Sequence, residues 1–246
     1  MTDDVLVSPA ELFGDGVFET VHLRPSGPFL LPAHLTRLAR SAALLDLAVP
    51  DLGRLEAFRS DISESALRII FTRRSHHVTV APIPPDALRE RRDGVRVISA
   101  GLGFKVGGKP PWSLWEAKTL SYAESFAARR WARSRGADDL LWLSTEGYAL
   151  EAPTASLVWL AGSELCTVPP REAQILPGTT AAHLLSLAPS VGLSPAYRMV
   201  TIEQLRGADA IWLASALRGL SFVRQLDGAP RRHSRWTPIL LDLLGY

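Results

Sequence analysis

Cysteine is nearly absent from this chain of 246 residues, because Cys166 is the only one. A single thiol excludes an intramolecular disulfide and a metal site built from several cysteines. Long apolar runs are absent too: the longest nearly apolar stretch, residues 208–217, contains Asp209 and is too short to cross a bilayer. No apolar segment typical of a secretory signal follows the first four residues. We therefore expect a cytoplasmic protein that is not embedded in a membrane.

An excess of charge of one sign is also lacking. The chain has 27 basic and 25 acidic residues, and the resulting net charge of +2 argues against nucleic acid as a partner. Lysine is scarce, because Lys105, Lys109 and Lys118 are the only three and arginine supplies the rest of the basic count. The remaining composition is ordinary for a globular protein, with 47% hydrophobic and 21% charged residues.

Periodicity predicts a mixture of strands and helices along the whole chain. Residues 18–23 alternate apolar and polar side chains as a half-buried strand does, and 32–48 carry an apolar stripe at helical spacing. Further strands are predicted at 66–73, 77–83, 94–100, 140–144, 148–151, 156–160, 165–168 and 210–216, and further helices at 52–58, 122–135, 178–187 and 238–244. This mixture predicts an α/β or α+β fold.

The stretch 101–111 contains glycine, lysine and proline with little periodicity, so it predicts a linker. We expect a smaller N-terminal α/β domain over residues 1–105, a linker over 106–114 and a larger C-terminal domain over 115–246. Residues 103–109 nearly match a phosphate-binding P-loop, but Pro110 stands where serine or threonine would hold magnesium. A linker is therefore the better interpretation. Because no H-E-x-x-H or C-x-x-C pattern occurs, no metal is expected.

Five short segments carry the side chains best suited to chemistry. They are Gly-Asp-Gly-Val-Phe-Glu-Thr at 14–20, His-Leu-Thr-Arg-Leu at 34–38, Lys-Thr-Leu-Ser-Tyr at 118–122, Leu-Glu-Ala-Pro-Thr at 150–154 and Ile-Leu-Pro-Gly-Thr-Thr at 175–180. Each alone has an ordinary explanation, such as a turn for the glycines or a solvated helix charge for Arg37. Together and in this order they resemble the fold type IV family of pyridoxal-phosphate enzymes over residues 14–226. That family includes branched-chain and D-amino-acid aminotransferases and 4-amino-4-deoxychorismate lyase.

The resemblance implies pyridoxal 5′-phosphate as the cofactor and Lys118 and Glu151 as the catalytic residues. The amine of Lys118 would bind the cofactor aldehyde as a Schiff base and later move protons. Lys105 and Lys109 lie in the predicted linker, which is a poor platform for a rigid site. Glu151 would keep the pyridine nitrogen protonated, which makes the ring an electron sink.

The cofactor phosphate needs hydrogen-bond donors and positive charge. Thr179 and Thr180 follow Gly178 at a predicted helix start, where free N–H groups favour an anion. Arg37 would add a charged contact and Ser215 a hydroxyl. The residues expected to bind the cofactor are therefore Arg37, Lys118, Glu151, Thr179, Thr180 and Ser215.

Substrate contacts follow less directly from the sequence. Arg73, at the end of a predicted strand, is a candidate for binding the substrate carboxylates, and the alternative is a solvated pair with Arg74. Many family members carry asparagine where Leu157 stands and arginine where Ala181 stands. Both differences remove polar contacts near the cofactor.

The resemblance also implies a two-domain homodimer with the cofactor in the cleft between the domains. Residues 14–20, 150–154 and 214–219 look most like the lyase, which makes 4-aminobenzoate and pyruvate for folate synthesis. We therefore expect a pyridoxal-phosphate-dependent lyase acting on a small-molecule amine. An aminotransferase for a branched-chain or D-amino acid would share every cofactor contact and stays open as the alternative. A cofactor-binding protein without turnover is a third interpretation.

Overall fold

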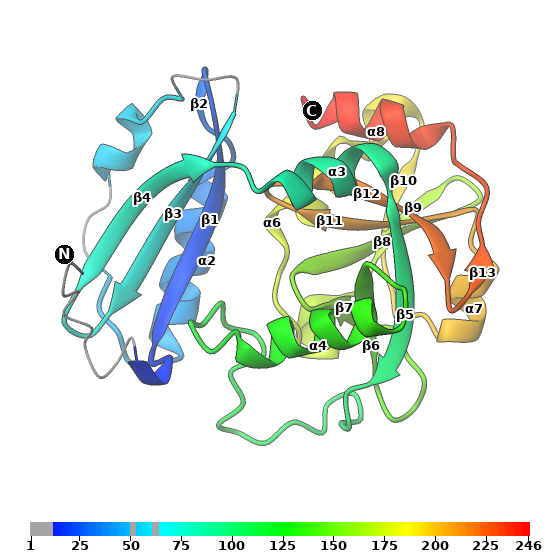
Figure 1. Cartoon of the computed structure of the whole chain (residues 1–246), viewed down its shortest axis with the longest axis horizontal. Coiled ribbons are helices and arrows are strands. Elements are labelled where there is room, and N and C mark those ends of the chain that lie inside the picture. Colours follow the sequence, from blue (N-terminus) through cyan, green and yellow to red (C-terminus); the bar gives the residue numbers. More distant parts are fainter. Residues whose placement is uncertain (1–11, 50–52, 61–63) are drawn as a thin grey trace. The chain divides into compact units, whose positions relative to one another are not determined.

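The computed structural model describes residues 12–49, 53–60 and 64–246 of the chain. Its helices and strands, labelled in Figure 1, divide into two compact units. Unit 1 contains Met1–Ile83 and Leu114–Glu124, and unit 2 contains Pro84–Ser113 and Ser125–Tyr246. Each unit combines helices with a β-sheet, which agrees with the predicted mixed fold.

Unit 1 is built on an antiparallel sheet. Within the described residues its strands are β1 (Gly16–Arg24), β2 (Gly27–Pro28), β3 (Ser65–Thr72) and β4 (His76–Pro82), in the order β2-β1-β3-β4. Helix α2 (Leu31–Ala43) packs against β1. Leu38 and Ala42 of α2 are buried in one core cluster with Val21 of β1, which confirms the predicted apolar stripe.

Helix α2 ends at Ala43 rather than at the predicted residue 48. Asp46 adopts a left-handed backbone conformation with φ 52°, which a right-handed helix cannot include. Leu47 beyond this turn is still buried in the core of unit 1. The helix predicted over 52–58 is the 3₁₀ helix η1 (Gly53–Ala57), and position 52 lies outside the described residues.

Unit 2 is built on a mixed sheet. Within the described residues the strand order is β10-β9-β8-β11-β12-β5-β6, with β7 paired to β8 and β13 to β12. The pairs β10–β9, β12–β5 and β5–β6 are parallel, and the other pairs are antiparallel. The strands are β5 (Val95–Gly101), β6 (Asp139–Leu143), β7 (Glu151–Ala152), β8 (Ala155–Ala161), β9 (Glu164–Thr167), β10 (Ser194–Tyr197), β11 (Ala210–Ser215), β12 (Gly219–Leu226) and β13 (Ala229–Pro230).

Helices connect these strands and complete the core of unit 2. The helices are α3 (Pro85–Asp93), α4 (Ala123–Ser134), α5 (Pro170–Ala173), α6 (Thr179–Leu187), η2 (Ala188–Val191), α7 (Ile202–Arg206) and α8 (Trp236–Leu243). Leu184 of α6 and Leu240 of α8 are fully buried in one cluster with Trp212 of β11. The Trp212 indole donates a hydrogen bond to Thr237 Oγ1 over 3.0 Å, so its buried polar atom is satisfied.

The division into units differs from the predicted domain boundaries. Residues 84–105, expected in the smaller domain, belong to unit 2 because β5 pairs with β6 and β12. Residues 115–124, expected in the larger domain, belong to unit 1 because Thr119 bridges Val17 of β1. Both assignments are decided by pairing with strands that are distant in sequence. The local composition of the chain does not indicate such pairing.

Helix α3 was not predicted. Its sequence Pro-Asp-Ala-Leu-Arg-Glu-Arg-Arg-Asp has almost no apolar stripe, so the periodicity that identifies an amphipathic helix is missing. Pro85 in the first turn and the acidic Asp86 beside it are the start signals that the sequence does contain. Within the described ranges, none of the helices is long and apolar enough to span a bilayer.

Candidate active site

Lys118 lies in the segment of unit 1 that runs beside β1. Its carbonyl oxygen accepts a hydrogen bond from Phe18 N at 2.9 Å, and its own N–H donates to Ser41 Oγ at 3.0 Å. Bonds of this kind on both sides of the residue fix its backbone between β1 and α2. The predicted catalytic lysine is therefore attached to regular secondary structure rather than to a loose linker.

The amine of Lys118 is held by two aromatic residues. Nζ donates a hydrogen bond to Tyr122 Oη at 2.9 Å and lies 4.4 Å from the centre of the Phe18 ring. Phe18 and Tyr122 contact each other edge to face, with ring centres 4.9 Å apart. The phenol can accept a hydrogen bond from an ammonium group or donate one to a neutral amine. Sequence reasoning did not assign Tyr122 this role, although it stands four residues after Lys118.

Arg37 does not lie at a solvated helix surface. Its side chain is 10% exposed and forms a bidentate ion pair with the fully buried Glu19, with Nε–Oε1 at 2.6 Å and Nη2–Oε2 at 2.8 Å. His34 Nδ1 contacts the same Oε2 at 2.7 Å. Glu19 occupies an inward position of β1, between Val17 and Val21, so this charge cluster lies inside the core of unit 1.

The cluster shifts the pKa values of both its titratable members. Burial alone would raise the pKa of Glu19, but the Arg37 charge and the hydrogen bonds from Arg37 and His34 outweigh burial and lower that pKa from 4.5 to about 2. Burial lowers the pKa of His34, and the partial compensation from Glu19 does not restore it. At neutral pH, Glu19 is therefore ionised and His34 is neutral, so His34 Nδ1–H donates to the carboxylate.

Arg73 follows β3 and connects two segments of unit 1. Its guanidinium contacts Asp15 Oδ2 at 3.2 Å and donates to the carbonyl oxygens of Leu45 at 2.8 Å and Asp46 at 3.2 Å. These contacts join the turn before β1 to the turn after α2. Its role in binding substrate carboxylates stays a prediction.

Glu151 lies in unit 2 on the short strand β7, opposite Ser156 of β8. Its side chain is buried, and Oε1 accepts a hydrogen bond from Leu176 N at 3.4 Å. Leu176 belongs to the loop that leads into α6. The predicted acidic residue is therefore linked directly to the segment that carries the predicted phosphate ligands.

The start of α6 lies against Ser156. Gly178, the residue before the helix, has no side-chain cap on it, and a Cβ at Gly178 would be 2.0 Å from Ser156 Oγ. Only glycine fits this approach without a shift of the Ser156 side chain or of the helix start. The first N–H groups of the helix have no partner within it and favour an anion, and Thr179 and Thr180 begin the helix there.

Ser156 also connects this region to Ser215. Ser156 pairs with Ala214 of β11, and Ser215 follows as the last residue of that strand. Glu151, Thr179, Thr180 and Ser215, all predicted cofactor residues, therefore gather around Ser156. With the described residues, the hydroxyls of Ser156, Thr180 and Ser215 form no hydrogen bond. Sequence reasoning missed Ser156.

Strand alternation explains why Ser156 was missed. Leu157, where we noted the loss of a polar residue, is 1% exposed in the sheet, and neighbouring side chains of a strand point to opposite faces. Ser156 is therefore the polar residue of β8 that faces α6. Ala181 is buried in the core cluster of unit 2 and faces away from solvent.

The residues present match the chemical needs of the expected cofactor. An aldehyde requires an amine, for which Lys118 of unit 1 is the predicted source; a pyridine nitrogen requires a carboxylate, for which Glu151 of unit 2 is the predicted source. A phosphate requires donors, for which the hydroxyls of Thr180 and Ser215 and the start of α6 are the predicted sources. In the described part of the chain, no group of three or more His, Cys, Asp or Glu side chains lies close enough to hold a metal ion.

Comparisons with known proteins agree with this chemistry. Residues 16–226 match the family model of the class IV amino-transferases. The chain is 37% identical to the bifunctional aminodeoxychorismate lyase / D-amino acid transaminase of Mycobacterium tuberculosis, over 94% of this chain and 87% of that protein.

Two solved structures are similar along nearly the whole chain. A hypothetical aminotransferase from Mycobacterium tuberculosis in its PLP-bound form has a TM-score of 0.89 at 34% identity, over 99% of this chain and 93% of that one. The fold IV-transaminase of Curtobacterium pusillum has a TM-score of 0.89 at 35% identity, over 100% of this chain and 92% of that one. The protein therefore belongs to the class IV aminotransferase family and is a pyridoxal-phosphate-dependent enzyme of fold type IV.

Proposed function

We propose that this enzyme is a 4-amino-4-deoxychorismate lyase, which produces 4-aminobenzoate and pyruvate in folate biosynthesis. The observation that carries the proposal is the 37% identity to a relative named for this lyase activity, over 94% of the chain. The lyase-like segments 14–20, 150–154 and 214–219 support the same choice. We also propose that the enzyme is cytoplasmic and acts as a homodimer, as the family resemblance implies.

Each candidate residue has a defined task in this reaction. Bound pyridoxal phosphate supplies an electron sink for negative charge at the substrate carbon that bears the amine. Lys118 would hold the cofactor through its amine, and the same amine would serve as the base that takes the proton from that carbon. General-base action of this kind contributes on the order of 10²–10⁴ in rate. Tyr122 Oη, 2.9 Å from Nζ, holds the amine in place for the transfer.

The other candidate residues would bind the cofactor and orient it. Glu151 keeps the pyridine nitrogen protonated, and the contact of its carboxylate with Leu176 N fixes its direction. Thr179, Thr180 and Ser215 would donate hydrogen bonds to the phosphate. Arg37 adds positive charge and is itself held by Glu19.

A second candidate function is transamination of a D-amino acid at the same site. The printed name of the Mycobacterium tuberculosis relative includes D-amino acid transaminase, and the Curtobacterium pusillum structure is of a transaminase. A transaminase for branched-chain amino acids would use the same cofactor contacts. These activities differ from the lyase in one testable way, because transamination needs a keto acid to complete each cycle.

The experiment compares both reactions on one preparation of the holoenzyme. Aminodeoxychorismate is supplied without any keto acid, and 4-aminobenzoate is measured over time. The lyase proposal expects many turnovers per active site. Consumption of aminodeoxychorismate that stops after one equivalent without release of 4-aminobenzoate, and resumes when 2-oxoglutarate or pyruvate is added, would instead establish a transaminase. D-Alanine with 2-oxoglutarate gives the second rate for comparison.

A further inference from the structure

The turn between β11 and β12 is held at every carbonyl oxygen. Tyr246 Oη donates to the carbonyl of Ala216, and Arg91 donates to the carbonyls of Leu217 at 2.5 Å and Arg218 at 3.2 Å. The turn directly follows Ser215. These hydrogen bonds hold the β11–β12 turn rigidly in place within unit 2.

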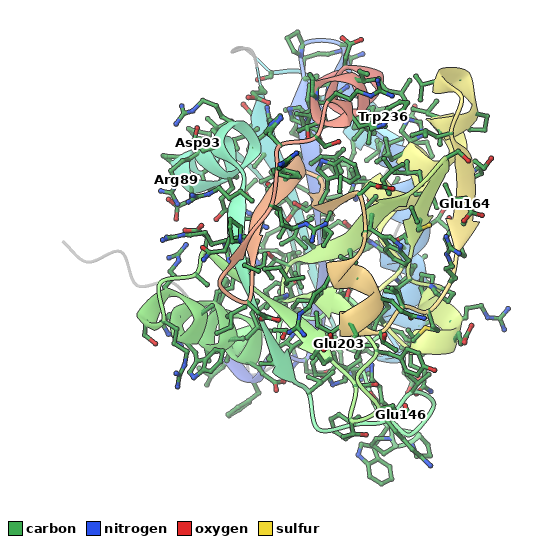
Figure 2. The ribbon with its side chains drawn as sticks, turned by 90° about the vertical axis from the view of Figure 1, so that its right-hand side faces the viewer. Arg89, Asp93, Glu146, Glu164, Glu203 and Trp236 are labelled. Carbon is green, nitrogen blue, oxygen red and sulfur yellow. The ribbon has the colours of Figure 1, made fainter. Side chains whose placement is uncertain are left out.

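The side chain of Arg218 extends from this turn into the protein interior and is 5% exposed. Nε contacts Glu90 Oε2 at 2.9 Å, and Nη1 contacts Asp139 Oδ2 at 2.8 Å. Arg129 also contacts Glu90, at 2.7 Å, so two arginines balance two buried carboxylates. Helix α3 contributes Glu90 inward, whereas Figure 2 shows its residues Arg89 and Asp93 pointing outward.

A third contact of Arg218 is not needed for charge balance. Nη2 donates a hydrogen bond to Thr154 Oγ1 at 2.8 Å. Thr154 lies at the tip of the β7–β8 hairpin, in the loop closed by the pair Ala152↔Ala155. Glu151 lies directly before Ala152 in the short strand β7 and pairs with Ser156 of β8. Arg218 thus connects the tip of one hairpin to the turn of another.

We propose that Arg218 is a positioning residue, which fixes the β7–β8 hairpin and thereby sets the place of Glu151 relative to Ser215. This inference rests on the proposed cofactor roles of Glu151 and Ser215. The planar guanidinium suits the task because it presents Nε, Nη1 and Nη2 to three separate partners, and a lysine ammonium does not reproduce this fork. Glu90 and Asp139 hold the Arg218 guanidinium in place, and its hydrogen bond to Thr154 fixes the tip of the β7–β8 hairpin.

Three variants test the proposal on the full chain. Thr154→Val removes the hydrogen-bond acceptor at nearly constant shape and leaves both carboxylate contacts of Arg218 intact. Thr154→Ser keeps the hydroxyl. Thr237→Val is the matched control, because it also removes a hydroxyl that accepts one hydrogen bond, there from Trp212; Thr237 is buried, whereas Thr154 is half-buried. The cost to stability of the two valine variants is expected to be similar.

Two measurements do not depend on turnover. The first is amide hydrogen exchange over residues 150–156 of the cofactor-free protein, and the second is the dissociation constant for pyridoxal phosphate titrated into it. We expect Thr154→Val to speed exchange in the hairpin and to raise the dissociation constant about tenfold, the effect of losing one charge-assisted hydrogen bond. Thr154→Ser should restore both values, and Thr237→Val should leave both unchanged.

The proposal is overturned if Thr154→Val matches Thr237→Val in both measurements. It is also overturned if exchange increases while the dissociation constant does not, because the hairpin would then be held without positioning the cofactor site. Failure of the proposed lyase function is a separate outcome. If the wild-type protein has no lyase activity but Thr154→Val still produces these two shifts relative to it, Arg218 remains a positioning residue.

Discussion

At the scale of single residues, the reactive amine is the first feature to test. Borohydride reduction should attach the cofactor permanently to Lys118, whose Nζ lies between Phe18 and Tyr122. Peptide mass mapping of the reduced holoenzyme identifies the labelled lysine. Lys105 and Lys109 serve as internal controls in the same digest, and a label on either would remove Lys118 from the proposed site.

Glu151 is tested by an isosteric change. Glu151→Gln keeps the shape of the side chain but cannot stabilise a protonated pyridine nitrogen. We expect turnover to fall by at least about tenfold, because the favourable charge interaction is lost, while the dissociation constant for the cofactor changes much less. Steady-state rates and cofactor titration measure the two effects. An unchanged turnover number would exclude Glu151 from the mechanism.

The buried charge cluster of unit 1 predicts acid sensitivity. The folded pKa of His34 is lower than its value of 6.5, so the unfolded chain binds that proton more readily and stability falls as pH drops below 6.5. The folded pKa of Glu19 is about 2 instead of 4.5, so its contribution is complete above pH 4.5 and is lost as pH falls toward 2. That contribution is about 3 kcal/mol.

Urea unfolding of the protein between pH 7.5 and 3 measures this dependence. Glu19→Gln should flatten the change in unfolding free energy below pH 4.5, even though it lowers stability overall. Glu203→Gln is the control, because Glu203 lies on the outer surface of α7 in Figure 2 and is 74% exposed. If the unfolding free energy of Glu19→Gln changed with pH as steeply as that of Glu203→Gln, the assignment of the acid sensitivity to Glu19 would be contradicted.

At the scale of elements, the start of α6 depends on its close approach to β8. Gly178→Ala would place a Cβ 2.0 Å from Ser156 Oγ, so the Ser156 side chain, the helix start or the strand must move. We expect the cofactor dissociation constant to rise about tenfold or more, since overpacking of this kind costs about 1–3 kcal/mol. Gly101→Ala is the matched control, because a Cβ there meets nothing within 4 Å. Equal affinity in the two variants would remove α6 from the site.

Some helices and site residues could be predicted from the sequence, and others could not. Local signals identified α6 and α8, because the signals that start a helix and its periodicity act over a few residues. Lys118 and Glu151 could be nominated by residue type and by the family resemblance. Ser156 could not, because its importance arises from strand register that pairs it with Glu151 on one side and Ala214 on the other.

At the scale of the whole molecule, neither unit is a continuous piece of chain. Unit 1 takes in residues 114–124 after the chain has already built α3 and β5 of unit 2. The predicted boundary at 106–114 followed a composition change, whereas the packing follows the strand pairs of β1 and β5. A fragment ending at residue 105 would lack the Lys118 segment and would expose one unpaired strand.

This interleaving of the two units constrains the order of events at the ribosome. Residues up to Ile83 emerge first, but the segment that carries Lys118 follows only after β5, whose partners β6 and β12 are still to be made. Val95 and Val97, buried in the finished sheet, are therefore exposed on the nascent chain for the time needed to translate the remainder. The predicted catalytic Lys118 is thus synthesised at a stage when its own chain exposes β5, an unpaired apolar strand, to chaperones.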